Sequence, residues 1–399
     1  MSVCMGMAAL SIDMLLPAFG DMREDFGLEA GSTEVSQVIT TFFLGLAVGQ
    51  LLYGPLSDRY GRKRLLYLGL AIFVLGGVAA ALTTSLAGLS AARFVWGFGA
   101  AAPRSLAVAM VRDTFEGERM ARTMSFVMAA FILVPVFAPA AGAAVLAVAP
   151  WRTVLWVQVG AAVGLGLWAT RLPETLHPDD RRQVTPSALA GAIVAVARSR
   201  QTLVFGLAIT AIFGIMTSYI GSAEVLIDEV FGQGDRFPLI FGVLAGTMAF
   251  GALLSARLVV RIGLARLVRG GAAYLLTMAS VLAVLARATD GRPSLAAFGV
   301  VLAMLLPGIA ILIPSCNAAA MAPLGHVAGM GAAVLGTIST AGGALLGTLT
   351  DRAFDGTASP FAFHVLAFAA IAAGTIIAFG RPPRVGVVEP EAVEPVAAA

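Results

Sequence analysis

Apolar segments recur along the whole chain, and a short polar turn ends each of them. A helix needs about 20 predominantly apolar residues to cross the hydrocarbon core of a bilayer, so each segment predicts one membrane-spanning helix. We expect twelve, which return the chain to the side of the membrane on which it starts. The approximate spans are 2–20, 35–55, 64–83, 88–110, 121–148, 152–170, 201–222, 237–259, 267–286, 295–320, 327–350 and 360–380.

The longest polar stretch, RLPETLHPDDRRQVTPS, lies between the sixth and seventh predicted spans and divides them into two sets of six. Two related six-helix bundles are a common plan in secondary transporters. We expect an N-terminal bundle at 1–172, a cytoplasmic linker at 173–200 and a C-terminal bundle at 201–381. Within the linker, ALAGAIVAVARSR predicts a short amphipathic helix on the inner membrane surface. The acidic tail at 382–399 contains four prolines and is predicted to be disordered.

The basic residues are unevenly divided between the two sets of turns. Eighteen of the 26 Lys and Arg residues fall in the turns and tail on the N-terminal side, whereas six fall on the other side. The remaining two, Arg93 and Arg104, lie inside the fourth span. Because cytoplasmic loops carry the excess of Lys and Arg, this distribution predicts a multi-pass protein of the cytoplasmic (inner) membrane with both termini in the cytoplasm.

The composition indicates an integral membrane protein, because 59% of the 399 residues are hydrophobic and only 12% are charged. Soluble domains carry about 25% charged residues. The two cysteines and three histidines are widely separated, so neither a disulfide framework nor a metal site is expected. The chain has no G-x-x-x-x-G-K-[ST] motif and no insertion large enough for a catalytic domain. We therefore expect no enzyme activity, no cofactor and no nucleic-acid partner; an ion gradient would drive transport, or transport would be passive.

The turn between the second and third spans, GPLSDRYGRKR, combines one acidic residue with a run of basic residues. It resembles the loop 2–3 signature of the major facilitator superfamily, whose members are secondary transporters with two six-helix halves. The resemblance implies a conformational latch, in which the signature Asp engages helix eleven and helps to hold the outward-facing state. Its residues here are Gly54, Asp58, Arg59, Gly61 and Arg62.

In that interpretation Asp58 meets the N-terminal end of helix eleven, whose partial positive charge favours a carboxylate. The alternative is a plain positive-inside anchor, which explains the basic residues but not Asp58 or the glycines. The matching turn of the second half, VRIGLARLVR, is a degenerate copy. Aligning Gly263 with Gly61 puts Val260 at the position of Asp58, so the acid is missing.

Asp13 lies in the first span, about 10 Å below the outer interface if the helix rises 1.5 Å per residue. A carboxylate at that depth must be neutral, paired or facing an aqueous cavity, which makes Asp13 a candidate proton site. Arg93 lies at a similar depth in the fourth span, so a pair whose strength depends on the proton is possible. The alternatives are that Asp13 reaches interfacial water and that Arg93 snorkels outward. Arg104 could line the cavity or snorkel inward.

Two further segments resemble signatures of proton-coupled facilitators. RFVWGFGAAAP around Arg93 is similar to the helix-four signature, with Trp96 where that pattern usually has Gln. LVPVFAPAAGAAV in the fifth span is similar to the antiporter signature of drug exporters, which places a bend at Pro135, Pro139 and Gly142. Proline removes a backbone donor and small residues allow close helix approach. A generic kinked helix remains the alternative for the fifth span.

Several local matches are similar to the Bcr/CflA group of drug:proton antiporters, among them LSIDMLLPAF, MVRDTFEGERMAR, LPETL, IPSCNAAAMAP and SYIGSAEVLIDEVFG, where Glu224 replaces the usual proline. The resemblance implies a proton-coupled exporter of drugs or lipophilic metabolites that works by alternating access, and separately we expect a monomer. The alternatives are uptake of a specific small molecule and a non-transporting membrane sensor. Side chains that could line an adaptable apolar cavity are Phe19, Phe42, Phe131, Met216 and Tyr219.

Overall fold

The computed structural model describes residues 1–177, 179 and 186–379, and within these residues every regular element is a helix. In this described part of the chain, twelve helical segments are long and apolar enough to cross a membrane, as the sequence predicts. The first is broken into α1 (Ser2–Asp13), η1 (Leu16–Ala18) and α2 (Phe19–Asp25). The others are α3 (Gln37–Tyr60), α4 (Arg62–Leu82), α5 (Leu86–Thr114), α6 (Gly117–Leu146), α7 (Arg152–Ala169), α9 (Arg200–Val225, continued by η4, Leu226–Val230), α10 (Phe237–Ile262), α11 (Leu264–Ala288), α12 (Leu295–Met321), α13 (Ala328–Arg352) and α14 (Ser359–Phe379).

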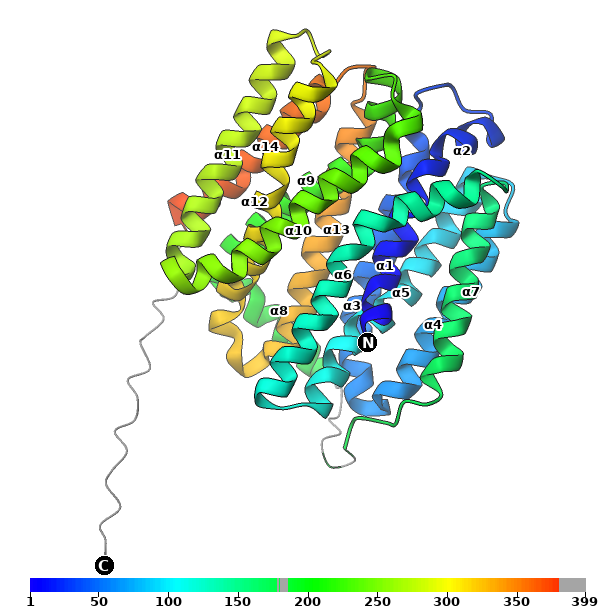
Figure 1. Cartoon of the computed structure of the whole chain (residues 1–399). Coiled ribbons are helices and arrows are strands. Elements are labelled where there is room, and N and C mark those ends of the chain that lie inside the picture. Colours follow the sequence, from blue (N-terminus) through cyan, green and yellow to red (C-terminus); the bar gives the residue numbers. More distant parts are fainter. Residues whose placement is uncertain (178, 180–185, 380–399) are drawn as a thin grey trace, which may run out of the picture.

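The spans form two groups of six that stand side by side (Figure 1). Helices α1 to α7 pack mainly on one another, and so do α9 to α14. The main contacts between the groups join α3 to α13 and α6 to α10. We call the side that holds the N-terminus and the α3–α4 turn the inner side, and the opposite side the outer side. The predicted fold class, two bundles of six membrane helices, is confirmed.

The first span departs from the prediction of one continuous helix over 2–20, because α1 ends at Asp13. The cause is Pro17, the second residue of η1. Proline in a helix has no N–H to donate, and its ring clashes with the carbonyl group four residues earlier, which here belongs to Asp13. The break therefore falls at the one acidic residue in the middle of the span.

The predicted amphipathic helix of the linker is α8 (Pro186–Arg198). Its apolar face packs against α13 and the residues before it, so that Ala192 and Val196 are buried against Leu324 and Val334. This helix thus covers the inner end of α13. Residues 178 and 180–185 of the predicted linker and the predicted disordered tail at 382–399 lie outside the described residues, and the domain boundaries remain predictions.

Candidate functional site

A cavity of about 130 Å³ lies between the two groups of helices, with walls from α1, α3, α5, α6, α9 and α10. Its lining is mostly aromatic and aliphatic, but it includes Asp13 and Arg104. Of the two predictions for Arg104, lining the cavity or snorkelling inward, the structure shows the first. The lining residues are Ala8, Ala9, Ile12, Asp13, Phe43, Leu46, Arg104, Phe131, Pro135, Phe213, Met216, Tyr219, Ile220, Phe241, Ala245 and Met248.

Three of the five predicted cavity residues line this space, namely Phe131, Met216 and Tyr219. The other two are buried elsewhere. Phe19 is in the core at the start of α2, and the ring of Phe42 lies 4.5 Å from the guanidinium carbon of Arg93. Successive residues of an α-helix point in directions that differ by 100° about its axis. An aromatic residue in a span next to the cavity therefore need not point into the cavity.

The Asp13 carboxyl is only 4% exposed, and in the described residues it forms neither an ion pair nor a hydrogen bond. It is close enough to Tyr219, on the other group of helices, for an electrostatic interaction. The Tyr219 hydroxyl is also buried without a hydrogen-bond partner, and its ring stacks on Phe241 with centroids 5.2 Å apart. A buried carboxyl without a partner is costly when ionised, so its charge depends on what enters the cavity.

Arg93 is fully buried but is not paired with Asp13 in this conformation. Its Nε donates to the carbonyl oxygen of Val38 at 3.3 Å and its Nη2 to that of Ser11 at 3.1 Å. The guanidinium carbon lies 5.0 Å from the ring centroid of Trp96, the residue that replaces the usual Gln. Arg93 therefore joins α5 to α1 and α3 through backbone carbonyls and aromatic faces.

The break after Asp13 is covered by the antiporter-like segment of α6. A Cβ atom on Gly142 would lie 2.1 Å from the carbonyl oxygen of Met14, so only glycine allows this approach. Pro139 lies about one turn before Gly142, and Pro135, one turn earlier still, lines the cavity. Gly142 thus allows α6 to lie close to the chain directly after Asp13, the candidate proton site.

We expect Gly142→Leu to lower the melting temperature in detergent and to abolish transport, because the side chain cannot fit beside Met14. Overpacking of this kind costs about 1–3 kcal/mol or more. The matched control is Gly160→Leu on α7, where a Cβ atom meets open space. Equal effects of the two substitutions on melting and transport would contradict a specific role for Gly142.

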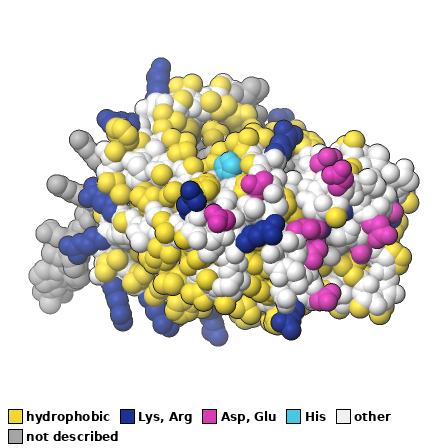
Figure 2. Space-filling model, turned by 90° about the horizontal axis from the view of Figure 1, so that it is seen from above, with side chains coloured by type: hydrophobic (Ala, Val, Ile, Leu, Met, Phe, Trp, Pro, Cys, Tyr) yellow, Lys and Arg dark blue, Asp and Glu magenta, His cyan; other side chains and the backbone are white. Residues whose placement is uncertain are grey.

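The outer side is closed by a buried ion pair between the two groups of helices. Arg23 of α2 donates from Nη2 to Glu224 Oε1 at 2.6 Å and from Nη1 to Glu224 Oε2 at 2.9 Å. The two side chains are only 6% and 8% exposed. Glu224 and Asp228 also border a hollow on the outer face. On the same face, acidic side chains gather over the N-terminal helices (Figure 2).

A second buried carboxyl, Asp351, lies near the outer end of α13 and was not among the predicted site residues. It is 4% exposed and accepts a hydrogen bond from Ser222 of α9 at 2.8 Å. Thr33 donates to its backbone carbonyl at 2.7 Å, which ties the segment before α3 to α13. The signal that could have found Asp351 is an acidic residue within one turn of a predicted span end; Glu224 stood out only as a replaced proline.

On the inner side, Arg62 connects the predicted latch to two acidic residues of the same group of helices. Its Nε donates to Asp113 at 2.9 Å, and its Nη1 donates to Asp58. Glu174 of the LPETL segment accepts from the backbone N–H groups of Arg62 and Lys63, at 2.9 and 3.2 Å, and so caps α4.

The five latch residues thus lie together at the α3–α4 turn, but the described part of the chain gives Asp58 no bond to α13. Arg59 is exposed and lies over the ring of Tyr60, and a Cβ atom on Gly54 would meet open space. Asp58 is 40% exposed and has its ionic partner on its own group of helices. The eleventh membrane span, the predicted partner of Asp58, is α13. The contact between Asp58 and α13 therefore remains a prediction for another conformation, in which the inner side is closed.

Gly61 and Gly263 have similar backbone conformations, with φ of 100° and 79°, as their alignment in the two halves predicts. We expect Gly61→Ala to lower the melting temperature more than Gly263→Ala. Both variants strain the backbone by about 1–3 kcal/mol. Only at Gly61 does the new Cβ meet a side chain, 2.6 Å from Glu174 Oε2. Equal losses in thermal melts of the two variants would rule out a contribution from Glu174.

Comparison with known proteins identifies the family. The sequence model described as Major Facilitator Superfamily matches residues 1–348. The chain belongs to the major facilitator superfamily. Among solved structures of this fold, a D-xylose–proton symporter has a TM-score of 0.74 at 13% identity and covers 96% of the chain and 97% of its own. The human organic anion transporter MFSD10 has a TM-score of 0.64 at 20% identity, over 94% and 95%.

Several curated relatives of this facilitator carry drug-resistance names. The bicyclomycin resistance protein homolog of Haemophilus influenzae is 27% identical over 65% of this chain and 65% of its own length. The chloramphenicol resistance protein of Pseudomonas aeruginosa is 28% identical over 82% of this chain and 77% of its own. The MFS-type transporter YdgK of Bacillus subtilis, described as uncharacterized, is 28% identical over 82% and 81%. Drug:proton antiporters of the superfamily are the group that the sequence resembles.

Proposed function

We propose that this facilitator is a proton-coupled exporter of drugs or lipophilic metabolites. The observation that carries the proposal is the buried Asp13 carboxyl without a partner, on the wall of a cavity between the two groups of helices. The drug-resistance names of several relatives support the same substrate class. Export of drugs is favoured over uptake of a nutrient for that reason.

The cavity explains how proton and substrate exclude each other. When Asp13 is protonated, it is neutral and tolerates the apolar surroundings. A lipophilic substrate packs against the aromatic and Met side chains, which adapt to different shapes. A positively charged or hydrogen-bond-donating group on such a substrate binds the ionised Asp13 carboxyl, whereas protonation removes that negative partner. Proton and substrate therefore compete for one carboxyl, which is the requirement for antiport.

Alternating access requires that the outer side opens and the inner side closes. The cavity of about 130 Å³ is smaller than the roughly 300–1,000 Å³ of typical ligand sites, so it must widen when substrate binds. Outer opening separates Arg23 from Glu224. Inner closure brings Asp58 to the N-terminal end of α13, where the helix dipole favours its charge.

We assign the protein to the bacterial cytoplasmic membrane, with both termini and the α3–α4 turn in the cytoplasm, because the basic residues concentrate on that side. The same orientation directs the closed side of the molecule to the exterior. In it, protons that enter through the opened outer side reach Asp13 and leave towards the cytoplasm.

The test is substrate-driven proton movement in inside-out vesicles, followed with an acridine pH dye and a panel of antibiotics. We expect at least one lipophilic compound to release protons from vesicles that contain the protein and not from vesicles without it. If no compound does so although the protein is folded in the membrane, proton-coupled export is wrong. Accumulation of a small molecule without proton release would instead support uptake.

A further inference from the structure

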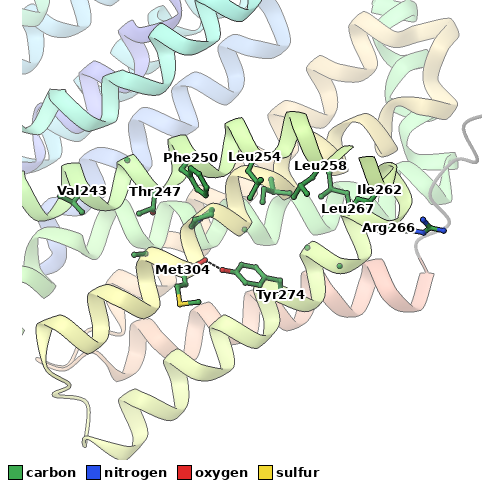
Figure 3. A pocket seen from close by; sticks show the side chains of 17 residues that line it. Val243, Thr247, Phe250, Leu254, Leu258, Ile262, Arg266, Leu267, Tyr274 and Met304 are labelled. Carbon is green, nitrogen blue, oxygen red and sulfur yellow. Dashed lines mark hydrogen bonds between the residues drawn. The ribbon is translucent and has the colours of Figure 1, made fainter. Parts of the chain in front are cut away.

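A long groove runs along the membrane-facing surface of α10, α11 and α12, on the far side of α10 from the cavity (Figure 3). Its volume is about 700 Å³. The α10 lining begins at Val243 and ends at Ile262, about 28 Å along the helix axis. The groove is therefore longer than one leaflet of the hydrocarbon core, which is about 15 Å.

The walls of the groove are apolar, and glycines in its lining make it deep because they have no side chain. The Tyr274 hydroxyl donates to the carbonyl oxygen of Met304 at 2.6 Å, so it has no hydrogen left to donate to a ligand. Gly246 of α10 and Gly270 of α11 both line the groove, and a Cβ atom on either would meet open space. Phe250 is 63% exposed at its rim. The surface is shaped for a flexible hydrocarbon chain.

The inner end of the groove is strongly basic. Arg266 lines it there (Figure 3). Arg257 and Arg261 are exposed in the last turns of α10, next to the α10–α11 turn. The sequence contains no acidic residue between Asp235 and Asp290. Within residues 1–177, 179 and 186–379, neither Arg261 nor Arg266 has an ion pair.

The corresponding turn of the first half is different, because Asp58 and Asp113 neutralise Arg62 there. In the second half Val260 takes the place of Asp58 and is 84% exposed. The loss of the acid thus leaves positive charge at the inner end of the apolar groove. Each Lys or Arg near a membrane surface contributes about 1 kcal/mol to the attraction of anionic lipid.

We propose that the groove binds one acyl chain of an anionic phospholipid, and that Arg266 and Arg261 hold its phosphate group. The groove supplies the apolar surface for the chain, and the turn supplies the charge for the headgroup. Since α10 has Ala245 and Met248 on the cavity and Gly246 and Phe250 on the groove, the lipid supports the helix that forms one wall of the cavity. The lipid site does not depend on the direction of transport.

Native mass spectrometry of the full chain in detergent tests the proposal. Phosphatidylglycerol and phosphatidylcholine with identical acyl chains are titrated against the unmodified protein and its variants. We expect the unmodified protein to bind phosphatidylglycerol about tenfold more tightly than phosphatidylcholine. Arg261→Gln/Arg266→Gln should remove that preference, whereas Gly246→Leu/Gly270→Leu should weaken both lipids about tenfold by filling the groove. The matched control is Gly160→Leu/Gly164→Leu on α7, where both new Cβ atoms also meet open space.

Three results would overturn the site. They are equal affinity for the two lipids, unchanged binding in the filled groove, and equal weakening by the α7 control. A chain-length series with the unmodified protein keeps the test independent of folding of the variants. Affinity for phosphatidylglycerol should rise from 8-carbon to 16-carbon chains more steeply than affinity for the detergent micelle alone. Free glycerophosphoglycerol, the headgroup without acyl chains, is added at the same concentration as the lipid. If it displaces phosphatidylglycerol, the site binds only the anionic headgroup, which would contradict an acyl chain in the groove.

Discussion

Vesicles that contain Asp13→Asn release no protons on addition of a compound that drives release by the unmodified protein. Asparagine keeps the shape of the side chain but cannot ionise, so the cavity retains its form and loses its titratable group. The expected loss is complete, to the level of vesicles without the protein, because Asp13 is the only acidic side chain among the described residues that line the cavity. The acridine dye reports the release, and exchange of labelled compound across the membrane reports whether the cavity still binds it.

The matched control is Glu34→Gln, which removes an exposed carboxyl at the outer end of the same group of helices. It should leave proton release unchanged. If Asp13→Asn still releases protons, antiport stands but its proton site lies elsewhere, and Asp351 is then the next carboxyl to replace because it is buried on the second group of helices. If both variants lose release and exchange together, the loss reflects folding rather than coupling.

Glu224→Gln opens the outer side. The substitution leaves the Arg23 guanidinium buried without its ionic partner, and breaking a buried pair in this way costs about 3–5 kcal/mol. That cost falls only on the conformation in which the pair is buried, so the population of outward-open molecules should rise about a hundredfold or more. Spin labels at Glu24 and Asp235, which are exposed near the outer ends of the two groups, should move apart. The buried Cys4 and Cys316 are replaced by alanine for this measurement.

The control for the ion pair is the double substitution Arg23→Met/Glu224→Met. Apolar residues of similar volume often replace a buried pair without loss of stability, so this variant should remain closed. A closed single variant, or a double variant that opens as far as the single one, would show that the pair does not hold the outer side. Transport by the double variant then tells whether the charges are needed for more than closure.

The twelve spans were predictable because each is a local property of the sequence. About 20 apolar residues suffice to define a membrane helix whatever its neighbours are. The predicted third span, 64–83, corresponds to α4 at Arg62–Leu82. The glycine of the α3–α4 turn was also predictable as a special position, and its copy at Gly263 has the same left-handed φ. The break after Asp13 was missed, although Pro17 lies four residues later and gives the signal.

The partners of the charged residues were not predictable to the same extent. Depth along a helix gave Asp13 and Arg93 the same level, but the direction in which each side chain points depends on how the helices are rotated. Arg93 donates to the carbonyl oxygens of Val38 and Ser11 instead. Glu174 caps α4 from 112 positions further along the chain, and no local pattern specifies such a pair.

The sequence by itself determined the membrane class, the number of helices, the family signatures and the concentration of positive charge on one side. These follow from hydrophobicity and charge, which act residue by residue. Only the tertiary structure decided that Phe131, Met216 and Tyr219 share a cavity with Asp13, and that Arg23 and Glu224 meet across 201 positions of sequence. The tertiary structure also forms the apolar groove along α10, α11 and α12. Packing decides such features, because the position of each helix depends on the side chains of all its neighbours at once.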